Sequence, residues 1–569
     1  MARPAPHPEI KRKSSNNPGG TPSERTPLAA AVFVISFALL FSYAFFVRAH
    51  ELGLRPLHSD EGVNYYFLKG MREHFYYNYS HENYHGPLYF YLTAVSMLVF
   101  GQDNEISLRL SAVICGVLLM LPLLPLRKYT SDYFVLLSAL FIALSPSLVF
   151  YARYAIHETL LILCDFVFSV SVFCWLRAHR AFWLYIAMIS VAGMVCTKET
   201  FFIAVFCAGC GVLCSEYGLF REQWKSIRLQ RQHLYLAILA ATILVCAIYT
   251  AGFYWMTGIR ELVFAIPQWI GRTSSKGDHS KPFPYYLTAV ILPSEPYLAA
   301  AFGAGVLAIA GMSYTSRGRA YWLGDVSRIG RFLFAWFASS FFVYSGISYK
   351  TPWLALNVTL PGVLFIAWGL SRVLRIPSCG VLMSVSITLI ISGTAFHNMA
   401  RFNHRTNPVP GMETPIRESK PYGGGNPFSY VHTSPGMLAL VSDIKAYWKK
   451  NPNARILVGS GGYWPLPFYL RERASNIGYA QSRDPAEQSK QYDIIIVDKD
   501  VAWPGTAWQQ KYFRLSDAHE SMVYFRPLQE AAPIQSGKGT EQPSVSASEA
   551  PAETPASRTP SPAASKEDT

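Results

Sequence analysis

The stretch Leu28–Ala49 reads LAAAVFVISFALLFSYAFFVRA, and the tetrapeptide His58-Ser59-Asp60-Glu61 follows after a short loop. A run of 22 largely apolar residues is long enough to cross the ~30 Å hydrocarbon core of a bilayer as an α-helix. The run is too long for a cleaved signal and no small-residue cleavage site follows it, so we expect an uncleaved first span. Two adjacent carboxylates at a membrane surface are costly to desolvate, so their position indicates a function.

The whole chain, like its first span, is rich in hydrophobic residues and poor in charged ones. Of its 569 residues, 51% are hydrophobic and only 15% are charged, and the mean hydropathy is +0.18. A soluble globular protein carries about 25% charged residues. The composition therefore predicts a mainly α, polytopic helical membrane protein with about 11 transmembrane helices. The expected spans lie near residues 28–49, 107–126, 133–150, 159–176, 182–196, 199–215, 234–255, 286–312, 331–346, 353–371 and 378–396.

The distribution of Lys and Arg predicts the topology. With the N-terminus in the cytoplasm, the inner segments hold 19 Lys and Arg in 81 residues, and the outer loops hold 10 in 104. Counting the short apolar segment 86–100 as a crossing would place the basic loop 216–233 outside, so we expect 86–100 to be a juxtamembrane or re-entrant helix. The net charge of +14 is then topogenic and does not indicate a nucleic-acid partner.

Four regions follow from composition and patterning. Residues 1–27 are expected to be a disordered cytoplasmic tail, and 28–396 a transmembrane domain whose first outer loop is 50–106. Residues 397–529 are expected to lie outside as a small α/β domain, and the Pro-, Ala- and Ser-rich stretch 530–569 to be disordered.

Short patterns inside 397–529 support the α/β assignment. Leu438 to Lys450 is expected to be a helix, and the β-branched runs 454–459 and 492–497 to be buried strands. Gly459-Ser460-Gly461-Gly462 lacks the Lys-Ser/Thr of a phosphate-binding loop, so it is interpreted as a plain turn from a strand to a helix.

The nine cysteines all fall in apolar segments, so no structural disulfides are expected. Cys207, Cys210 and Cys214 have helical spacing, but no His lies near them, and packing inside a span is favoured over a metal site.

Polar residues gather where the expected spans end on the outer face. They are Asp60, Glu61, His85, Arg153, His157, Glu158, Lys198, Glu199 and Lys350. If the topology is right, they form one site.

Each of these residues also has a structural interpretation. Asp60 and Glu61 could be an exposed loop pair or could cap a helix that begins near Gly62. Arg153 and His157 are four residues apart and share a face if that stretch is helical, although an Arg at a membrane edge can simply extend to the interface. Lys198 and Glu199 could form a salt-bridged turn, and Lys350 could anchor a helix.

Several motifs together resemble the GT-C membrane glycosyltransferases. They are Asp60-Glu61 after the first span, His85-Gly86-Pro87-Leu88-Tyr89, Ile106–Ala112 (ISLRLSA), and Ser145-Pro146 followed by Arg153 and Glu158. Over about residues 28 to 400, the chain resembles the dolichyl-phosphate-mannose protein mannosyltransferases of glycosyltransferase family 39 and the lipid A aminoarabinose transferases. Within these it looks most like the bacterial and archaeal flippase activity-associated proteins, which implies a plasma-membrane location.

The resemblance implies roles for three of the polar residues. Asp60 matches the acidic residue of the first outer loop, which such enzymes use as a base or a metal ligand. Glu158 takes the place of a second acidic residue that is often Asp, and His85 stands where relatives carry His or Lys. A divalent cation (Mg or Mn) held by Asp60 and Glu158 is therefore expected as a cofactor.

The implied activity is transfer of a sugar from a polyprenyl-phosphate donor to an acceptor hydroxyl on a lipid, glycan or protein, at the outer face of the membrane. A carboxylate can deprotonate the acceptor, and Arg153, Lys198, Lys350 and His85 are candidates to stabilise the departing phosphate. One alternative is a non-catalytic flippase accessory or a transporter of lipid-linked sugar. A third interpretation, compatible with the enzyme, is that residues 397–529 are a binding module for an acceptor glycan or protein. A transporter would need paired broken helices near mid-bilayer. The polar residues stand instead at span ends, which favours the enzyme.

Overall fold

A computed structural model describes residues 26–83, 85–101, 103–216, 228, 230–274, 279–403, 425–480, 491–501, 508–516 and 519–528. Of the expected N-terminal tail 1–27, residues 1–25 lie outside the described residues, and so does the whole expected C-terminal tail 530–569. In the described part, eight helices are long and apolar enough to cross a membrane, one bent helix pair passes the same test as a unit, and three shorter apolar helices accompany them. The chain is a multi-pass integral membrane protein.

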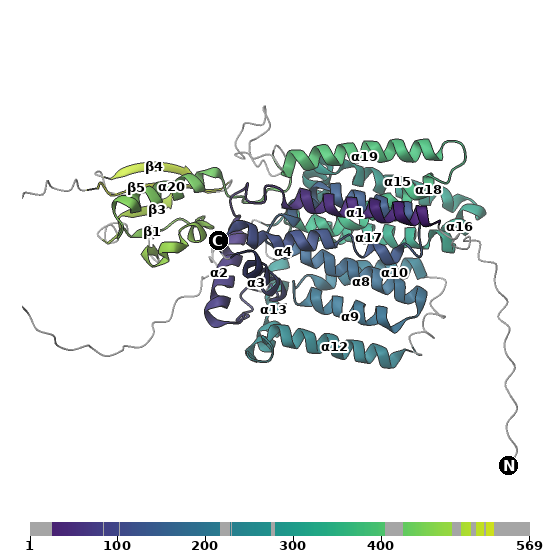
Figure 1. The fold of residues 1–569 in the computed structure, drawn as a ribbon, viewed down its shortest axis with the longest axis horizontal. Helices are drawn as coiled ribbons and strands as arrows, with labels where there is room; N and C mark the ends of the chain where they lie inside the picture. The colour runs from purple at the N-terminus through teal and green to yellow at the C-terminus, as the bar shows by residue number, and fades with distance from the viewer. Residues whose placement is uncertain are drawn as a thin grey trace, which may run out of the picture. The chain divides into compact units, whose positions relative to one another are not determined.

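Each of the predicted spans corresponds to helical structure (Figure 1). The helices are α1 (Pro27–Ala49), α4 (Glu105–Leu118) with α5 (Leu123–Leu126), α6 (Asp132–Leu144) with α7 (Pro146–Ala152), α8 (Glu158–Ala178), α9 (Ala181–Val195), α10 (Phe201–Glu216), α12 (Arg231–Tyr249), α15 (Pro296–Tyr314), α17 (Arg328–Gly346), α18 (Leu356–Val373) and α19 (Gly380–Asn403). The last helix extends past residue 396, where the sequence predicted its end.

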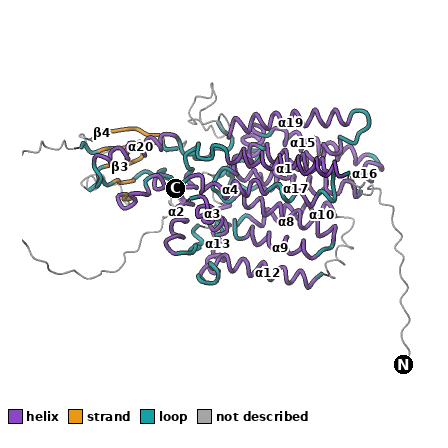
Figure 2. Tube along the Cα trace, in the orientation of Figure 1, coloured by secondary structure: helices purple, strands orange, loops and turns teal. Residues whose placement is uncertain are grey.

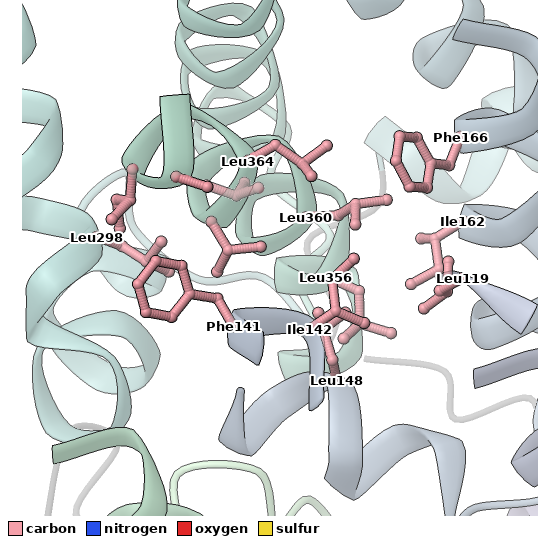
Figure 3. Packing of buried hydrophobic residues seen from close by; sticks show 14 of the residues in the cluster. Leu119, Phe141, Ile142, Leu148, Ile162, Phe166, Leu298, Leu356, Leu360 and Leu364 are labelled. Carbon is pink, nitrogen blue, oxygen red and sulfur yellow. The ribbon is translucent and has the colours of Figure 1, made fainter. Parts of the chain in front are cut away.

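Helix α18 forms the centre of the bundle. Its apolar window is 94% buried, against 22% for α1 and 17% for α19. Figure 3 shows its Leu360 and Leu364 among side chains from α6, α8 and α15, including Phe141, Phe166 and Leu298. Since lipid is as apolar as leucine, close packing rather than burial from water holds these helices together.

The span predicted at 133–150 is sharply bent. Helices α6 and α7 meet at an angle of 60°, because Pro146 cannot continue the hydrogen-bond ladder of α6. The buried carboxylate of Glu295 accepts hydrogen bonds from the hydroxyls of Ser145 (2.5 Å), Ser147 (2.8 Å) and Thr359 (3.2 Å). This polar cluster joins the bend to α15 and α18, and it gives the carboxylate hydroxyl partners instead of water.

Further helices lie between the spans. The longer ones are α2 (Ser59–His74), α3 (Leu88–Phe100) and α13 (Thr257–Ser274), and the shorter ones are α14 (Leu292–Ser294) and α16 (Ser316–Leu323). Helix α3 has 13 residues, too few to cross ~30 Å, and it exposes Leu92, Val95 and Leu98. The prediction of a short juxtamembrane or re-entrant helix at 86–100 agrees with this length. Helix α13 has no counterpart among the predicted elements.

The C-terminal α/β domain contains helix α20 (Pro435–Lys450) and a sheet whose strands are orange in Figure 2. The sheet has five strands in the order β2-β1-β3-β5-β4. The strands are β1 (Ile456–Val458), β2 (Ile477–Tyr479), β3 (Ile494–Asp498), β4 (Gln509–Arg514) and β5 (Glu520–Phe525). Strand β1 pairs in parallel with β2 and β3, and β5 pairs antiparallel with β3 and β4. The predicted helix and the two predicted strands are present, and the remaining three strands were not predicted.

The α/β domain contacts the loops around α2 within one compact unit, Met1–Arg526. The hydroxyl of Tyr469 donates to Glu105 (2.7 Å) and accepts the backbone N–H of Leu57 (2.8 Å). A Cβ added to Gly62 would lie 2.7 Å from the Cβ of Pro465, closer than real Cβ contacts. The absence of a side chain at Gly62 therefore lets this loop of the α/β domain pack directly on α2, two residues from Asp60.

Candidate active site

One cavity of about 310 Å³ collects most of the predicted site residues. It lies where the first turn of α2, the start of α8, the α9–α10 turn and the end of α17 meet. Six of the nine candidates line it: Asp60, His85, His157, Glu158, Lys198 and Glu199. Residues separated by more than 130 positions in the sequence are thus brought to one site, as the predicted topology requires.

Asp60 lies in the first turn of α2, which begins at a capping box formed by His58 and Glu61. The Nδ1 of His58 accepts the backbone N–H of Asp60 (3.0 Å), so the ring proton lies on Nε2, which donates to the carbonyl oxygen of Tyr430 (2.7 Å). A neutral His58 fixes the backbone at Asp60. The Asp60 side chain itself is 48% exposed, as a group that must reach a substrate needs to be.

Glu61 faces away from the cavity. Its carboxylate is fully buried and accepts hydrogen bonds from Arg109 Nε (2.8 Å) and Nη2 (2.6 Å), and from the backbone N–H groups of His58 (2.9 Å) and Ala155 (2.8 Å). Burial raises the pKa of Glu61, but Arg109 and these N–H groups lower it by more than burial raises it. The pKa of Glu61 therefore lies below its ordinary value. The expectation that Glu61 is catalytic is corrected: its contacts give it a structural role, holding α2 to α4.

Two cation–carboxylate pairs lie on the cavity wall. The ammonium of Lys198 contacts the carboxylate of Glu158, and both side chains are buried. Nδ1 of His85 lies 3.2 Å from Glu199 Oε2. Burial raises the pKa of Glu199, but His85 and Lys198 lower it to below its ordinary value, so this carboxylate stays ionised. The structural interpretation of Lys198-Glu199 as one salt-bridged turn is wrong, because each residue pairs with a different partner.

His157 is buried against aromatic rings. Its ring centroid lies 4.7 Å from that of His85 and 4.7 Å from that of Tyr89. Burial, together with the neighbouring His85 and Lys198, lowers the pKa of His157 well below its ordinary value, so its imidazole is neutral. The stretch from Arg153 to His157 is not helical, so the expectation that these two residues share a helix face is wrong. The chain turns and bends there, between the end of α7 and the start of α8.

Arg153 and Lys350 do not line the cavity. The guanidinium of Arg153 donates to backbone carbonyls in the last turn of α1 and just after it, including those of Val47 (3.0 Å) and His50 (2.6 Å). The ammonium of Lys350 is buried and donates to the carbonyl of Lys281 (2.9 Å). These contacts replace the substrate-binding roles expected for the two residues: Arg153 caps a helix end, and Lys350 ties two loops together.

Several wall residues were not predicted. Those from late in the chain include His279, Tyr344, Tyr349, Trp353 and Tyr430. The hydroxyl of Tyr430 is 2.7 Å from Nδ1 of His279, and its ring meets Trp353 edge to face at 5.8 Å. Tyr430 follows the last span, in a polar stretch whose sequence carries no signal that it returns to the membrane domain.

Asp60 and Glu158, the expected ligands of a divalent cation, both line the cavity, but Glu158 already faces the ammonium of Lys198. Among the residues that the structure describes, no group of three or more His, Cys, Asp or Glu could hold a metal ion. Mg²⁺ often binds through one or two carboxylates, with water and substrate phosphate completing its coordination, so only the pairing of Glu158 with Lys198 disfavours a cation here. All nine cysteines are free, as expected.

Gly86 sets the position of His85, and this can be tested. Its N–H donates to the carbonyl of Thr197 (3.1 Å), and a Cβ at this position would overlap the Cys196 carbonyl. We expect Gly86→Ala to destabilise the protein by about 1–3 kcal/mol and to lower any activity that depends on His85. Gly70→Ala on α2 is the control, because its Cβ would meet open space. Equal melting temperatures for the two variants would contradict the assignment.

Comparisons with known proteins place this site in a familiar fold. Residues 84–249 match the sequence model of the family described as dolichyl-phosphate-mannose-protein mannosyltransferase. The structure of ArnT from Cupriavidus metallidurans in the apo state superposes with a TM-score of 0.54 at 15% identity, covering 87% of this chain and 98% of that one. The same protein bound to undecaprenyl phosphate gives 0.50 at 14% identity, covering 89% and 99%. No curated protein matches the sequence.

These findings confirm the predicted resemblance to the GT-C superfamily, both to its protein mannosyltransferases and to an aminoarabinose transferase. The fold class, a helical membrane domain with a small C-terminal sheet, is confirmed as well. The narrower likeness to flippase activity-associated proteins stays a prediction.

Proposed function

We propose that this protein, which has the GT-C glycosyltransferase fold and contains a segment of the protein mannosyltransferase family, transfers a sugar from a polyprenyl-phosphate donor to an acceptor hydroxyl. The observation that carries the proposal is the cavity itself, in which an exposed carboxylate, Asp60, lies together with the buried pair Lys198–Glu158 and the partly buried pair His85–Glu199. Such a combination suits a reaction that needs both a base and a cationic site for a phosphate.

Asp60 is proposed as the general base. Its carboxylate accepts the proton of the acceptor hydroxyl while the acceptor oxygen forms a bond to the anomeric carbon of the donor sugar. The bond from that carbon to the phosphate oxygen breaks, and its electron pair stays with the phosphate. The products are the glycosylated acceptor and polyprenyl phosphate. A single displacement of this kind inverts the configuration at the anomeric carbon.

Lys198 and His85 are proposed to stabilise the phosphate. An ammonium has three N–H donors, and the contact with Glu158 fixes the direction of the Lys198 side chain. Glu199 orients the imidazole of His85 in the same way. N–H donors held in place before the reaction stabilise the charge that develops on the leaving phosphate.

A polyprenyl phosphate is supported as the donor carrier by two observations. The relative from Cupriavidus metallidurans has been solved with undecaprenyl phosphate bound. In this chain, the cavity opens where several apolar helices end, so a lipid tail could lie between spans while its phosphate reaches Lys198. The excess of Lys and Arg in the opposite loops supports a cavity on the outer face, with the N-terminus in the cytoplasm.

The test is a comparison of lipid extracts from cells with and without the protein, followed by transfer with the purified protein. We expect a polyprenyl-phosphate sugar to accumulate when the protein is absent and purified protein to consume that lipid. An unchanged lipid profile, together with no consumption in vitro, would contradict the function.

Transfer should not require an added divalent cation, because Glu158 is committed to Lys198. We expect the purified protein to keep its rate of donor consumption after dialysis against EDTA. A loss of rate that Mg²⁺ or Mn²⁺ restores would show instead that Asp60 and Glu158 share a metal, as the family resemblance implies.

A further inference from the structure

We propose that four aromatic side chains, Tyr66, Tyr463, Trp464 and Tyr479, form a track that binds the neutral sugar rings of an acceptor glycan. This rests on the proposed function and names the class of its acceptor. The track combines one residue of α2 with three residues of the α/β domain, from the segment after β1 and the end of β2.

The four rings form a continuous row. The ring centroids of Tyr66 and Trp464 are 6.2 Å apart, those of Trp464 and Tyr463 are 5.5 Å apart and stacked, and those of Tyr463 and Tyr479 are 5.2 Å apart. Tyr66 and Tyr479, at the two ends of the row, are 44% and 47% exposed. Tyr463 and Trp464, between them, are half-buried. Tyrosine and tryptophan rings are large and mostly buried in folded proteins, so the exposure of the two end rings indicates a surface used for binding.

The row begins beside the proposed base. A Cβ added to Gly62 would lie 3.1 Å from Cε3 of Trp464, so the indole packs against the helical turn that carries Asp60. From there, Tyr463 and Tyr479 continue onto the edge strand β2 of the sheet. A chain molecule bound along the row would therefore have one end next to the cavity that holds Asp60.

The chemistry of the row fits sugars. A pyranose ring presents C–H groups on its faces and hydroxyls at its edge, so it can stack on an aromatic ring while hydrogen bonding to a tyrosine hydroxyl. All four side chains are uncharged, which suits neutral sugars. The rings contact one another along the row, so the exposed rings at its two ends, Tyr66 and Tyr479, are the ones free to stack on a sugar.

The same rings could instead rest on a bilayer, since Trp and Tyr are enriched at membrane interfaces. The composition around them argues against it. In the described part of the α/β domain from residue 435 to 526, the only strongly exposed large hydrophobic side chains are Leu438, Tyr479 and Tyr512. A lipid-binding face needs aliphatic side chains that insert among the acyl chains. Between residues 435 and 526, the described part of this domain exposes one such side chain, Leu438.

Full-length protein in detergent tests the track through Tyr479→Ala, with Tyr512→Ala as the matched control. Tyr512 is 52% exposed and lies on strand β4, at the other edge of the sheet. The probes are two neutral hexasaccharides, mannohexaose and maltohexaose, and binding is followed through tryptophan fluorescence. We expect wild type to bind at least one probe, Tyr479→Ala to bind it about tenfold more weakly, and Tyr512→Ala to bind it as wild type does.

A second measurement distinguishes acceptor binding by the track from cleavage of the donor. Release of polyprenyl phosphate without any acceptor, with water as the attacking group, should be the same in Tyr479→Ala and wild type, while the KM for a long glycan acceptor rises in the variant. If wild type releases no polyprenyl phosphate but binds the hexasaccharide through Tyr479, the proposed function fails and the track stands.

Three results would overturn the track. Wild type could bind neither hexasaccharide, Tyr479→Ala and Tyr512→Ala could bind equally well, or Tyr479→Ala could reduce binding to phosphatidylethanolamine–phosphatidylglycerol vesicles with no effect on hexasaccharide binding. The last result would assign the rings to the membrane surface. Tyr66→Ala gives an independent measurement should Tyr479→Ala fold poorly.

Discussion

Asp60→Asn is expected to lower turnover by ~10²-fold or more, in line with the 10²–10⁴-fold contribution of a general base. The substitution keeps the shape of the side chain and removes its capacity to take a proton. Asp60 is half exposed in the first turn of α2, and His58 contacts its backbone N–H, so Asn should fit there without repacking. Rates of donor consumption by purified wild type and variant give the measurement.

The control for this prediction is stability measured on the same sample. Asp60→Asn should melt near the wild-type temperature, because an exposed carboxylate is not part of the core. Glu61→Gln, in contrast, should lower the melting temperature, because it weakens the buried pair of Glu61 with Arg109 (2.6 Å) that holds the start of α2. An Asp60→Asn variant with full activity would exclude Asp60 as the base.

Lys198→Met is expected to destabilise the protein by about 3–5 kcal/mol and to abolish turnover, because it leaves the carboxylate of Glu158 buried without its cation. Glu158→Gln should be costly for the same reason, with the ammonium left unpaired. The double variant Glu158→Gln/Lys198→Met removes both charges, so we expect it to recover much of the melting temperature of wild type.

The turnover of the double variant shows whether the Lys198–Glu158 pair is needed for the reaction or only for stability. If Lys198 binds the donor phosphate, the double variant should stay inactive although it is folded. Arg127 and Asp132 form a matched pair at 2.8 Å away from the cavity, and removing both should change neither activity nor, by more than ~1 kcal/mol, stability. Wild-type turnover in the folded double variant would reduce the Lys198–Glu158 pair to a structural contact.

The membrane fold is predictable from the sequence because each span is encoded locally. A helix that crosses lipid needs ~20 apolar residues, and the loop charges fix the parity of the crossings. The same reasoning distinguished the short helix at Leu88–Phe100 from a span. Strands β2, β4 and β5 escaped prediction because short or partly exposed strands carry weak patterns: the burial of β4 does not alternate, and β2 has only three residues.

The candidate site was predictable as a set but not in its pairings. Polar residues at span ends on one face had to converge, and six of the nine candidates do. The sequence could not show that Glu61 pairs with Arg109. In the sequence, Arg109 is one polar residue of a helix, and only the fold shows that it lies beside α2. The sequence also could not show that Tyr430 lies at the cavity. Tyr430 contacts His58, which is 372 positions away, and no local sequence pattern predicts such a contact.

The most direct test of the central claim is a single-turnover reaction of purified protein with a polyprenyl-phosphate sugar and its acceptor. Polyprenyl phosphate and glycosylated acceptor are measured together over time. The proposed chemistry predicts that the two products appear in equal amounts and at the same rate, and that Asp60→Asn forms neither. Movement of the intact lipid-linked sugar across a reconstituted membrane, with no polyprenyl phosphate released, would contradict the proposal and assign the cavity to transport.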